Sequence, residues 1–378
     1  MTQNSINLLK ELKKKAGNHS PSRKEISKAL KYDPVKIDSC FLSNPYATEL
    51  IYKYGLKEKI SNNFYNLIES YPPNQYFILD KLSMIEKIDP NKTIAFNGAQ
   101  QGIEVLLSEL QYKDILLPIP TYSSYYEAKN IKSNIHFHSL ESKNSFEIDF
   151  EKLNQDILEK RIDLLILINP NNPTGKSIST SDIKNLIKTH KNLQIIIDDS
   201  FSHFLPDLQT WINEKEIIMA SSENVYFVKS LSKDYGIAGF RIGYVQSNSP
   251  ILKSLKDRIG TWVINNFAVE CLDVMADDAF LLDYEKARLK YLQAKDIFYK
   301  NLRTIDALKV FNSDANFYLA KIPNEIEGFE FVMRLLIEEG IYIRSMSDKV
   351  GLDESYIRIA SRSETENKVI FDGLRTKF

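Results

Sequence analysis

The sequence predicts an α/β protein: a larger domain built on a mostly parallel β-sheet with helices on both faces, joined to a smaller α+β domain. Three observations lead to this prediction. From about Thr93, over roughly 150 residues, short Ile/Leu/Val-rich runs alternate with helical stretches, as strands alternate with crossover helices. The runs are nearly continuous, which is typical of strands buried on both faces. After Gly243 the chain changes to long helical segments followed by short strands.

The elements follow in this order. Residues 1–35 are polar and are predicted to be helical, ending at Asp33-Pro34. A strand and turn are expected in residues 93–100, followed by an amphipathic helix in residues 102–110. Further strand-and-turn segments are expected in residues 114–129, 134–140, 162–175, 193–201 and 225–236. Helical sequence runs from about residue 248 to 305, and the last strands are expected in residues 315–322, 340–346 and 356–361. We expect the smaller domain to comprise residues 1–45 and 250–378, and the larger domain residues 46–249.

Composition excludes several classes of function. The formal net charge of −1 gives no overall field that attracts nucleic acid or an anionic membrane, so neither is expected as a partner. Two cysteines, Cys40 and Cys271, argue against a disulfide framework and a cysteine-based zinc site. His136 and His138 indicate alternation on a strand, so no metal site is expected. The absence of a signal-peptide pattern and of a membrane-length apolar run predicts a cytoplasmic location.

The unusual motifs follow the predicted strands, at the sheet edge where ligands gather in such folds. Gly98 permits a tight turn, and the helix after it offers free N–H groups to an anion, although a purely structural turn would look the same. The segment "NPNNPTG", residues 169–175, combines two prolines with three asparagines. It predicts an ordered turn that holds asparagine amides toward a ligand.

Asp198 directly follows three isoleucines. A carboxylate at the end of a buried strand is costly unless it is paired or hydrogen-bonded. A helix cap is the alternative explanation, but Asp199 or Ser200 can serve as that cap and leave Asp198 for a cationic partner.

Lys233 lies at the exit of another apolar strand. A partly desolvated lysine amine loses its proton more readily and can form a Schiff base with a carbonyl. Ser230, Ser232 and Arg241 can neutralise and hydrogen-bond a phosphate beside it. Lys229 lacks such neighbours in the sequence and is interpreted as a surface charge. With a carboxylate to hold a protonated pyridine nitrogen, these groups are the parts of a pyridoxal 5′-phosphate (PLP) site.

In these motifs the chain resembles fold-type I PLP-dependent enzymes of the class I/II aminotransferase superfamily, in the histidinol-phosphate aminotransferase branch. The resemblance runs from about Gly17 to the C-terminus. It implies a seven-stranded sheet in the larger domain, a Schiff base at Lys233 and a pairing of Asp198 with the pyridine nitrogen. It also implies a homodimer, because Tyr71 resembles the tyrosine that reaches the cofactor phosphate from the other subunit.

The resemblance further assigns the remaining cofactor contacts. Asn172 would hydrogen-bond the phenolic oxygen of PLP, and Tyr122 would stack on the ring. The phosphate would be held at the turn of Gly98 by Ala99, Gln100, Ser230, Ser232 and Arg241.

Phe201 departs from the pattern, because the branch usually has a tyrosine that donates a hydrogen bond to the cofactor. The loss is about 1 kcal/mol, so drift is one explanation and a different reaction on the same cofactor is another. The related threonine-phosphate decarboxylases also have phenylalanine at this position. Residues 342–367 resemble their C-terminal region as well.

The resemblance also suggests how a substrate is bound. Arg344 and Arg358, expected at the ends of short strands, are the best candidates to bind a substrate phosphate and carboxylate. Lys15 and Asn18 lie in a segment similar to the glycine-asparagine loop of the decarboxylases, with Lys15 in place of a histidine. A surface role is equally open for Lys15. Asn44, in the N-terminal segment, would lie over the substrate site and close it.

The leading hypothesis is therefore a decarboxylase of O-phospho-L-serine or O-phospho-L-threonine that produces the phosphorylated amino alcohol. A substrate phosphate gives such an enzyme a group with which to fix the rotation of the substrate about Cα. The alternative is an aminotransferase of the histidinol-phosphate type acting on a phosphorylated substrate, since a fold does not fix a function. A non-catalytic binding protein is the third hypothesis, which the intact Lys233 and Asp198 disfavour. Arg362 is either a substrate contact or a surface charge.

Overall fold

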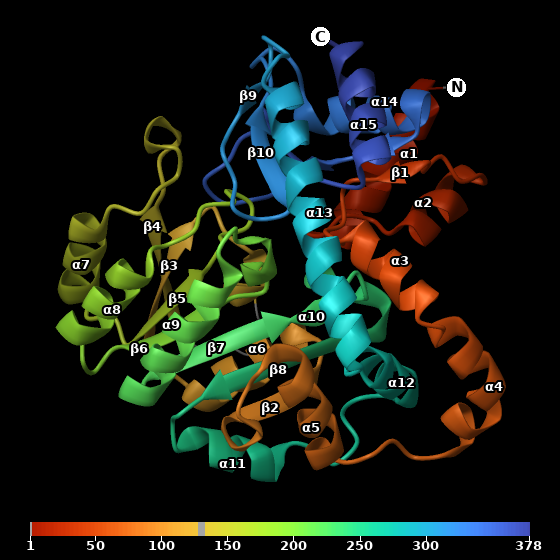
Figure 1. The fold of residues 1–378 in the computed structure, drawn as a ribbon. Coiled ribbons are helices and arrows are strands. Elements are labelled where there is room, and N and C mark those ends of the chain that lie inside the picture. Colours follow the sequence, from red (N-terminus) through yellow and green to blue (C-terminus); the bar gives the residue numbers. More distant parts are fainter. Residues whose placement is uncertain (1, 128–132) are drawn as a thin grey trace.

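The computed structural model describes residues 2–127 and 133–378, and it contains a large sheet and two small ones (Figure 1). The large sheet has seven strands in the order β2-β8-β7-β6-β5-β3-β4. All of them run parallel except β8, which is antiparallel to both neighbours. The predicted fold class is confirmed. The strands are β2 (Thr93–Asn97), β3 (Asp114–Ile119), β4 (Asn134–Ser139), β5 (Leu164–Ile168), β6 (Gln194–Asp198), β7 (Val225–Ser230) and β8 (Ile242–Ser247).

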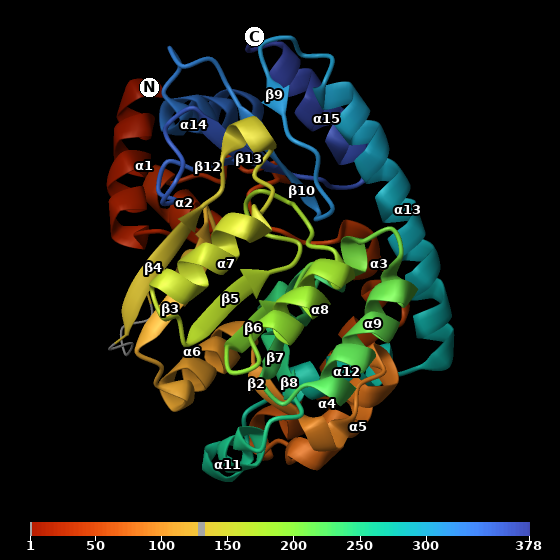
Figure 2. The same ribbon diagram turned by 90° about the vertical axis from the view of Figure 1, so that its left-hand side faces the viewer.

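Helices cover both faces of this sheet, which explains its nearly continuous apolar strands; every residue of β5, β7 and β8 is buried. Helices α6 (Ala99–Leu110) and α11 (Ile251–Arg258) share an apolar core with one face. Helices α7 (Phe150–Glu159), α8 (Thr180–Thr189) and α9 (Leu208–Ser221) cover the other face, the one turned toward the viewer in Figure 2.

Short helical turns connect several of these elements. They are η1 (Pro90–Lys92), η2 (Ser123–Tyr125), η3 (Ser142–Asn144), η4 (Ser202–Phe204), α10 (Leu231–Asp234) and η5 (Ala238–Phe240). In the segment predicted at 114–129, β3 is followed by η2, and residues 128 and 129 lie outside the described residues.

The smaller domain combines both ends of the chain. Its four-stranded sheet has the order β12-β13-β10-β9, with antiparallel neighbours. These strands are β9 (Lys309–Val310), β10 (Phe317–Lys321), β12 (Arg344–Ser345) and β13 (Tyr356–Ala360). A two-stranded sheet pairs β1 (Ile37–Asp38) with β11 (Ile341–Tyr342) in parallel. The helices are α1 (Thr2–Ala16), α2 (Arg23–Leu30), α14 (Gly328–Glu339) and α15 (Glu364–Arg375), which pack in one apolar core.

A third group of helices joins the two parts. Helices α3 (Pro45–Lys53), α4 (Leu56–Glu69), α5 (Gln75–Glu86) and α12 (Asn266–Met275) share a core with the first residues of α13 (Asp278–Leu302). The last residues of α13, Phe298 and Leu302, belong to the core of the smaller domain. Figure 1 shows this 25-residue helix running along both parts. The domain boundary at residue 250 stays a prediction.

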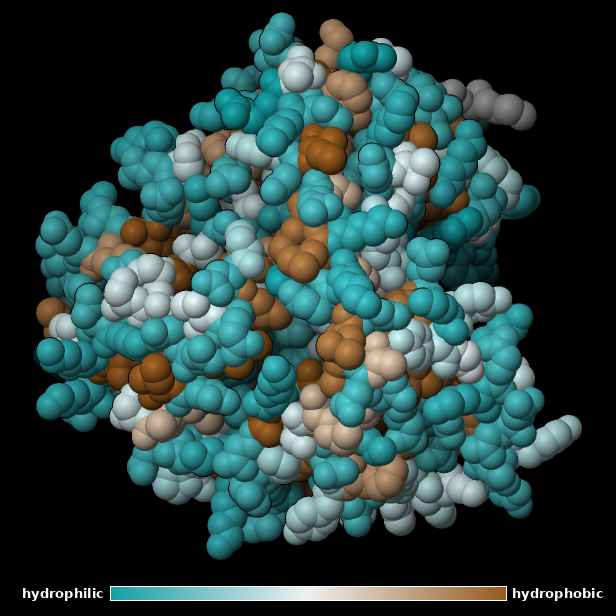
Figure 3. Space-filling model, viewed as in Figure 1, coloured by the Kyte–Doolittle hydropathy of each residue, from teal (hydrophilic) through white to brown (hydrophobic). Residues whose placement is uncertain are grey.

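The surface seen in Figure 3 is mostly hydrophilic, with small separate apolar areas. Among the helices in the described ranges, none is both long enough and apolar enough to cross a membrane.

Candidate active site

A cavity of about 330 Å³ lies at the carboxyl ends of the central strands of the large sheet. Twelve of the residues predicted from the sequence line it. They are Ala99, Gln100, Tyr122, Asn172, Asp198, Phe201, Ser230, Ser232, Lys233, Arg241, Arg344 and Arg358. The fold thus brings together motifs that are separated by up to about 260 residues in the sequence.

Asp198 is the last residue of β6 and is 5% exposed. One carboxylate oxygen accepts a hydrogen bond from the Tyr125 hydroxyl at 2.9 Å, and the other accepts from the Ser200 backbone N–H at 3.0 Å. Asp199 points elsewhere, because its carboxylate pairs with Lys215 at 3.1 Å. Asp198 therefore offers a fixed negative charge to a cationic group in the cavity.

Lys233 lies in α10, immediately after β7. Burial lowers the pKa of its amine, against the opposing effect of the Asp198 carboxylate. Its Nζ lies 5.1 Å from the centre of the Phe201 ring. Phe201 is itself held by an edge contact with Phe317, with ring centres 5.3 Å apart. A lysine amine with a lowered pKa in such a site is suited to attack a carbonyl and to transfer protons.

The end of the cavity near α6 fits a phosphate group. The Ser232 hydroxyl oxygen is buried and has no hydrogen-bond partner among the described residues. The N-terminus of α6 provides backbone N–H groups that have no partner within the helix. Gly98 has a φ of 78°, and a Cβ at this position would lie 2.4 Å from a guanidinium nitrogen of Arg241. A buried unpaired hydroxyl, a helix N-terminus and an arginine are the groups that a cofactor phosphate requires.

Arg358 lies in the middle of β13 and not at a strand end, where the sequence had placed it. It is 4% exposed and donates hydrogen bonds of 2.7 Å to Asn172 Oδ1 and to the Cys40 carbonyl. Burial and the nearby Arg344 lower its pKa to about 9. Its Nε has no partner within the part of the chain that the structure describes. Arg358 can therefore still donate to an anion in the cavity.

Arg344 is the first residue of β12, at a strand end as expected from the sequence. Its Nη2 donates to the Asn18 carbonyl at 2.8 Å and pairs with Asp348 at 3.1 Å. Its Nε is buried and unpartnered within residues 2–127 and 133–378.

Eight residues of the cavity wall were not predicted from the sequence, and two of them, His19 and Lys349, are ionisable. His19 follows the predicted 15–18 segment directly, so its position in the chain was a signal that could have been used. Burial, Lys349 and Arg344 lower the pKa of His19, which makes it neutral near pH 7. Lys349 stands in an ordinary polar stretch, "SDKVG", that carries no such signal.

Five predicted residues do not line the cavity, namely Gly98, at the turn before α6, and four others. Lys15 is exposed at the end of α1, and the Asn18 side chain donates to the Glu127 carboxylate. Asn44 is fully buried and caps α3, accepting hydrogen bonds from the Tyr46 and Ala47 N–H groups at 3.1 and 3.3 Å. Tyr71 is 77% exposed in this chain. Their predicted roles stay predictions.

The interpretation of Lys229 as a surface charge was wrong. The residue is 1% exposed, because β7 is covered on both faces. It pairs with the Asp234 carboxylate and donates to the Ser202 hydroxyl at 2.9 Å. Burial favours its neutral form, but the surrounding carboxylates, first Asp234 and then Glu86, outweigh this effect and raise its pKa.

Arg362 is half-buried, and its guanidinium donates to the Ser43 carbonyl at 3.1 Å.

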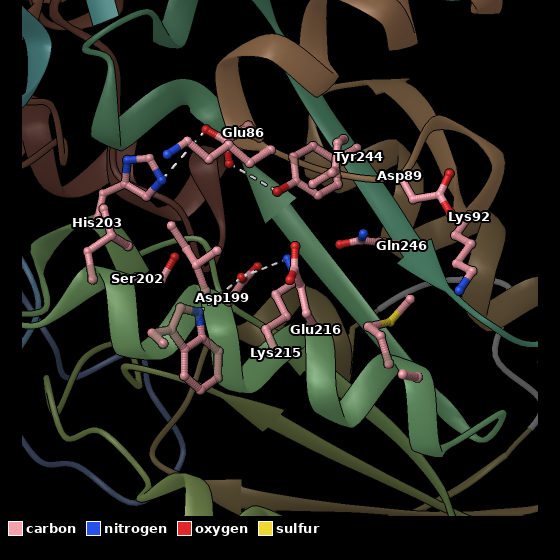
Figure 4. Close-up of a pocket in the computed structure, with 17 residues that line it drawn as sticks. Glu86, Asp89, Lys92, Asp199, Ser202, His203, Lys215, Glu216, Tyr244 and Gln246 are labelled. Atoms are coloured by element: carbon pink, nitrogen blue, oxygen red, sulfur yellow. Dashed lines mark hydrogen bonds and ion pairs between the residues drawn. The ribbon is translucent and has the colours of Figure 1, made fainter. Parts of the chain in front are cut away.

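Lys229 belongs to a layer of buried polar groups, because it contacts Asp199 and Ser202. These two residues line a second cavity of about 220 Å³ (Figure 4). Glu86 accepts hydrogen bonds from the hydroxyls of Tyr235 and Tyr244 at 2.7 and 3.0 Å. His203 lies beside Glu86, and burial lowers its pKa well below the usual value. Through Glu86, this layer connects α5 to η4, to Tyr235 after α10 and to β8. Within the described ranges, no cluster of three potential metal ligands occurs.

Comparisons with known proteins add to this geometry. The family model of aminotransferase class I and II matches residues 75–374. The chain is 37% identical to an L-serine phosphate decarboxylase of Sulfurospirillum multivorans over 369 residues, 97% of this chain and 94% of that protein. It is 33% identical to the L-serine phosphate decarboxylase Cj1436c of Campylobacter jejuni, over 98% of this chain and 96% of that one. The solved structure of a decarboxylase from Sulfurospirillum multivorans superposes with a TM-score of 0.90 at 35% identity, over 99% of this chain and 96% of that chain.

Proposed function

This chain belongs to the aminotransferase class I and II family, whose members depend on PLP, and we propose that it is a decarboxylase of a small O-phosphorylated amino acid. O-Phospho-L-serine is the first candidate substrate, because two relatives of nearly the same length are L-serine phosphate decarboxylases. O-Phospho-L-threonine is the second candidate.

The observation that carries this proposal is the charge of the cavity wall. Besides Lys233 and Asp198, the wall contains the guanidinium groups of Arg344, which is half-buried, and of Arg358, which is buried. Each of these arginines has a buried Nε without a partner among the described residues. A substrate that carries both a carboxylate and a phosphate supplies the anions that these groups lack.

Lys233, Arg344 and Arg358 would have different roles in this reaction. When bound, PLP supplies an electron sink for the electron pair left on the substrate Cα. The bond between Cα and the carboxylate breaks, CO2 leaves, and a proton takes its place, so O-phospho-L-serine yields O-phosphoethanolamine. Lys233 is the candidate donor of that proton, because the lowered pKa of its amine makes proton transfer easier. Arg344 and Arg358 hold the two anionic groups and so fix the orientation of the substrate.

The test is an incubation of the holoenzyme with O-phospho-L-serine or O-phospho-L-threonine in the absence of any keto acid. We expect CO2 and the phosphorylated amino alcohol, followed by phosphorus NMR, over many turnovers, and no product with Lys233→Ala. A reaction that stops after one turnover and resumes when a keto acid is added would identify an aminotransferase instead.

We further propose that the protein acts as a cytoplasmic homodimer in which Tyr71 reaches the site of the partner subunit. Tyr71 stacks on the exposed Trp262, with ring centres 4.4 Å apart. Further exposed aromatic residues lie on α4 and α5, close to Tyr71 in the sequence, and we call this set the aromatic surface patch: Phe64, Tyr65, Tyr71, Tyr76 and Trp262. Aromatic side chains gathered on a surface are typical of interfaces between subunits. Both cysteines are buried and unpaired, which suits a reducing compartment.

A further inference from the structure

We propose that Lys349 binds the phosphate group of the substrate and is the residue by which the site selects a phosphorylated amino acid. This inference rests on the proposed function and assigns a role to a residue that neither the motifs nor the family pattern had indicated. It is carried by the burial of Lys349, by the neutral groups around its ammonium and by the charge balance of the cavity.

The ammonium group of Lys349 is buried without a counter-ion. The residue is 6% exposed and lines the cavity. Its Nζ donates to the Ser123 hydroxyl at 2.9 Å and to the Asn18 carbonyl at 3.1 Å, and both acceptors are neutral. It forms no ion pair with a carboxylate of residues 2–127 or 133–378. Because a buried charge is costly unless it is paired, this arrangement is suited to an anion that arrives from outside.

The neighbouring charges do not supply that anion. The carboxylate of Asp348, the preceding residue, pairs with Lys13 and with Arg344 at 3.1 Å. Arg358 donates to two neutral oxygens. Of the three cations Arg344, Lys349 and Arg358, Arg344 alone forms an ion pair with Asp348 among the described residues, and the other nearby carboxylate, Glu127, accepts from the Asn18 side chain. In agreement with this excess of positive charge, burial and the charge of Arg344 lower the pKa of Lys349 to about 8.

The three cations are spread along the cavity wall. Arg358 contacts Asn172, on the side of the large sheet. Lys349 contacts Ser123 in η2 and Asn18 in the segment between α1 and α2, where Arg344 also binds the Asn18 carbonyl. A molecule with two anionic groups offers one anion to each of these two places. A phosphate at Lys349 and Arg344 leaves Arg358 for the carboxylate, and two negative charges on the phosphate match two adjacent cations.

The test compares Lys349→Met, which keeps the length of the side chain, with Lys349→Arg, which keeps the charge. Both are prepared as holoenzymes, so that inorganic phosphate cannot occupy the cofactor phosphate site. Lys295→Met is the matched control, because Lys295 is 4% exposed with a pKa lowered to about 8 but does not line the cavity. The affinities for inorganic phosphate and for O-phospho-L-serine are measured by calorimetry, and kcat/KM is measured for the latter and for L-serine.

We expect Lys349→Met to weaken phosphate binding about 10- to 100-fold, the usual effect of losing a hydrogen bond to a charged group. Its kcat/KM should fall for O-phospho-L-serine but not for any residual reaction with L-serine, whereas Lys349→Arg should keep most of the affinity. Unchanged phosphate affinity in Lys349→Met, or equal losses in Lys295→Met, would overturn the inference. Failure of the proposed function is a separate result, namely no CO2 from the wild-type protein. The phosphate affinities test Lys349 in that case too.

Discussion

At the scale of single residues, the two lysines at the end of β7 have opposite electrostatic environments. Lys229 belongs to the layer of buried polar groups and is neutralised by Asp234, so its charge is kept. Lys233 lies in the cavity, where burial outweighs the nearby carboxylates and lowers its pKa. Lys229 is thus a structural cation, whereas Lys233, a few residues later in the chain, is a reactive amine.

We predict that Lys229→Met lowers the free energy of unfolding by about 3–5 kcal/mol, because it leaves the buried Asp234 carboxylate without its partner. The double variant Lys229→Met/Asp234→Asn should regain part of this loss. Denaturant unfolding of the apoprotein measures both. Lys286→Met, which breaks an exposed pair with Asp283, is the control and should cost at most about 1 kcal/mol. A loss of the same small size in Lys229→Met would contradict the buried pair.

Phosphate binding should also depend on pH. Lys349, with its pKa lowered to about 8, carries its charge below that pH and loses it above, so phosphate affinity should fall as the pH passes through about 8. Lys349→Arg should move the fall toward the range of Arg358, whose pKa is lowered to about 9. The titratable and charged groups that face Lys349 are His19, Glu127, Arg344, Asp348 and Arg358. Calorimetry between about pH 7 and 9.5 measures the effect, and an affinity that stays constant in the wild type would argue against Lys349.

Sequence reasoning succeeded for residues whose neighbours in the sequence indicate where they lie in the fold. Asp198 and Lys233 each end an apolar strand, and parallel strands end at one edge of a sheet. It failed for Lys349, because the neighbours that matter lie far away in the sequence, in η2 and beside α2. It failed for Lys229 although the apolar run already indicated a strand covered on both faces, because the pairing with Asp234, in the helical turn after β7, is shown only by the structure.

At the scale of elements, two helices begin next to the cavity: α6 begins with the lining residues Ala99 and Gln100, and α3 begins just after the lining residues Leu42 and Ser43. The N-terminus of α6 meets the guanidinium of Arg241 across Gly98, and the N-terminus of α3 is held by Asn44. The backbone N–H of Asn44 also donates to the Lys233 carbonyl at 3.0 Å. The signal for this cap, an asparagine directly before Pro45, was present in the sequence. The resemblance drew attention to a substrate role instead.

For α6, we predict that Gly98→Ala weakens PLP binding about 10-fold or more, because its φ of 78° strains an alanine and the new methyl group displaces Arg241. Titration of the apoprotein with PLP measures the affinity. Gly239→Ala is the matched control, since a Cβ there meets no atom within 4 Å. Equal affinities in the two variants would show that Arg241 can move without loss.

For α3, Asn44→Ala should lower the free energy of unfolding by about 1–2 kcal/mol through loss of the cap. Asn44→Ser should keep most of the stability, because serine also caps helices well. Denaturant unfolding and the KM for the substrate are measured together. A raised KM at unchanged stability would restore the predicted substrate role of Asn44.

At the scale of the whole molecule, the aromatic surface patch and the cavity belong to one assembly if the protein is the proposed homodimer. We predict that Tyr71→Ala and Lys233→Ala, each nearly inactive alone, recover activity when mixed and allowed to exchange subunits. A mixed dimer has one site with both side chains intact, so about a quarter of the sites should be active in an equal mixture. Light scattering confirms the dimer. No recovery in dimers that do exchange would show that Tyr71 does not act across the interface.

The parallel pairing of β1 with β11 has a consequence for the order in which the protein matures. Residues 37–38 cannot pair with residues 341–342 until the latter, about 300 positions later in the chain, have been synthesised. At a translation rate of about 5–20 residues per second, the ribosome needs roughly 15–60 s to deliver that neighbour. During this interval the apolar side of α1 has no core to join, so the nascent chain exposes its first helix to chaperones until synthesis is nearly complete. The cavity wall near Asn18 is therefore among the last parts of the enzyme to form.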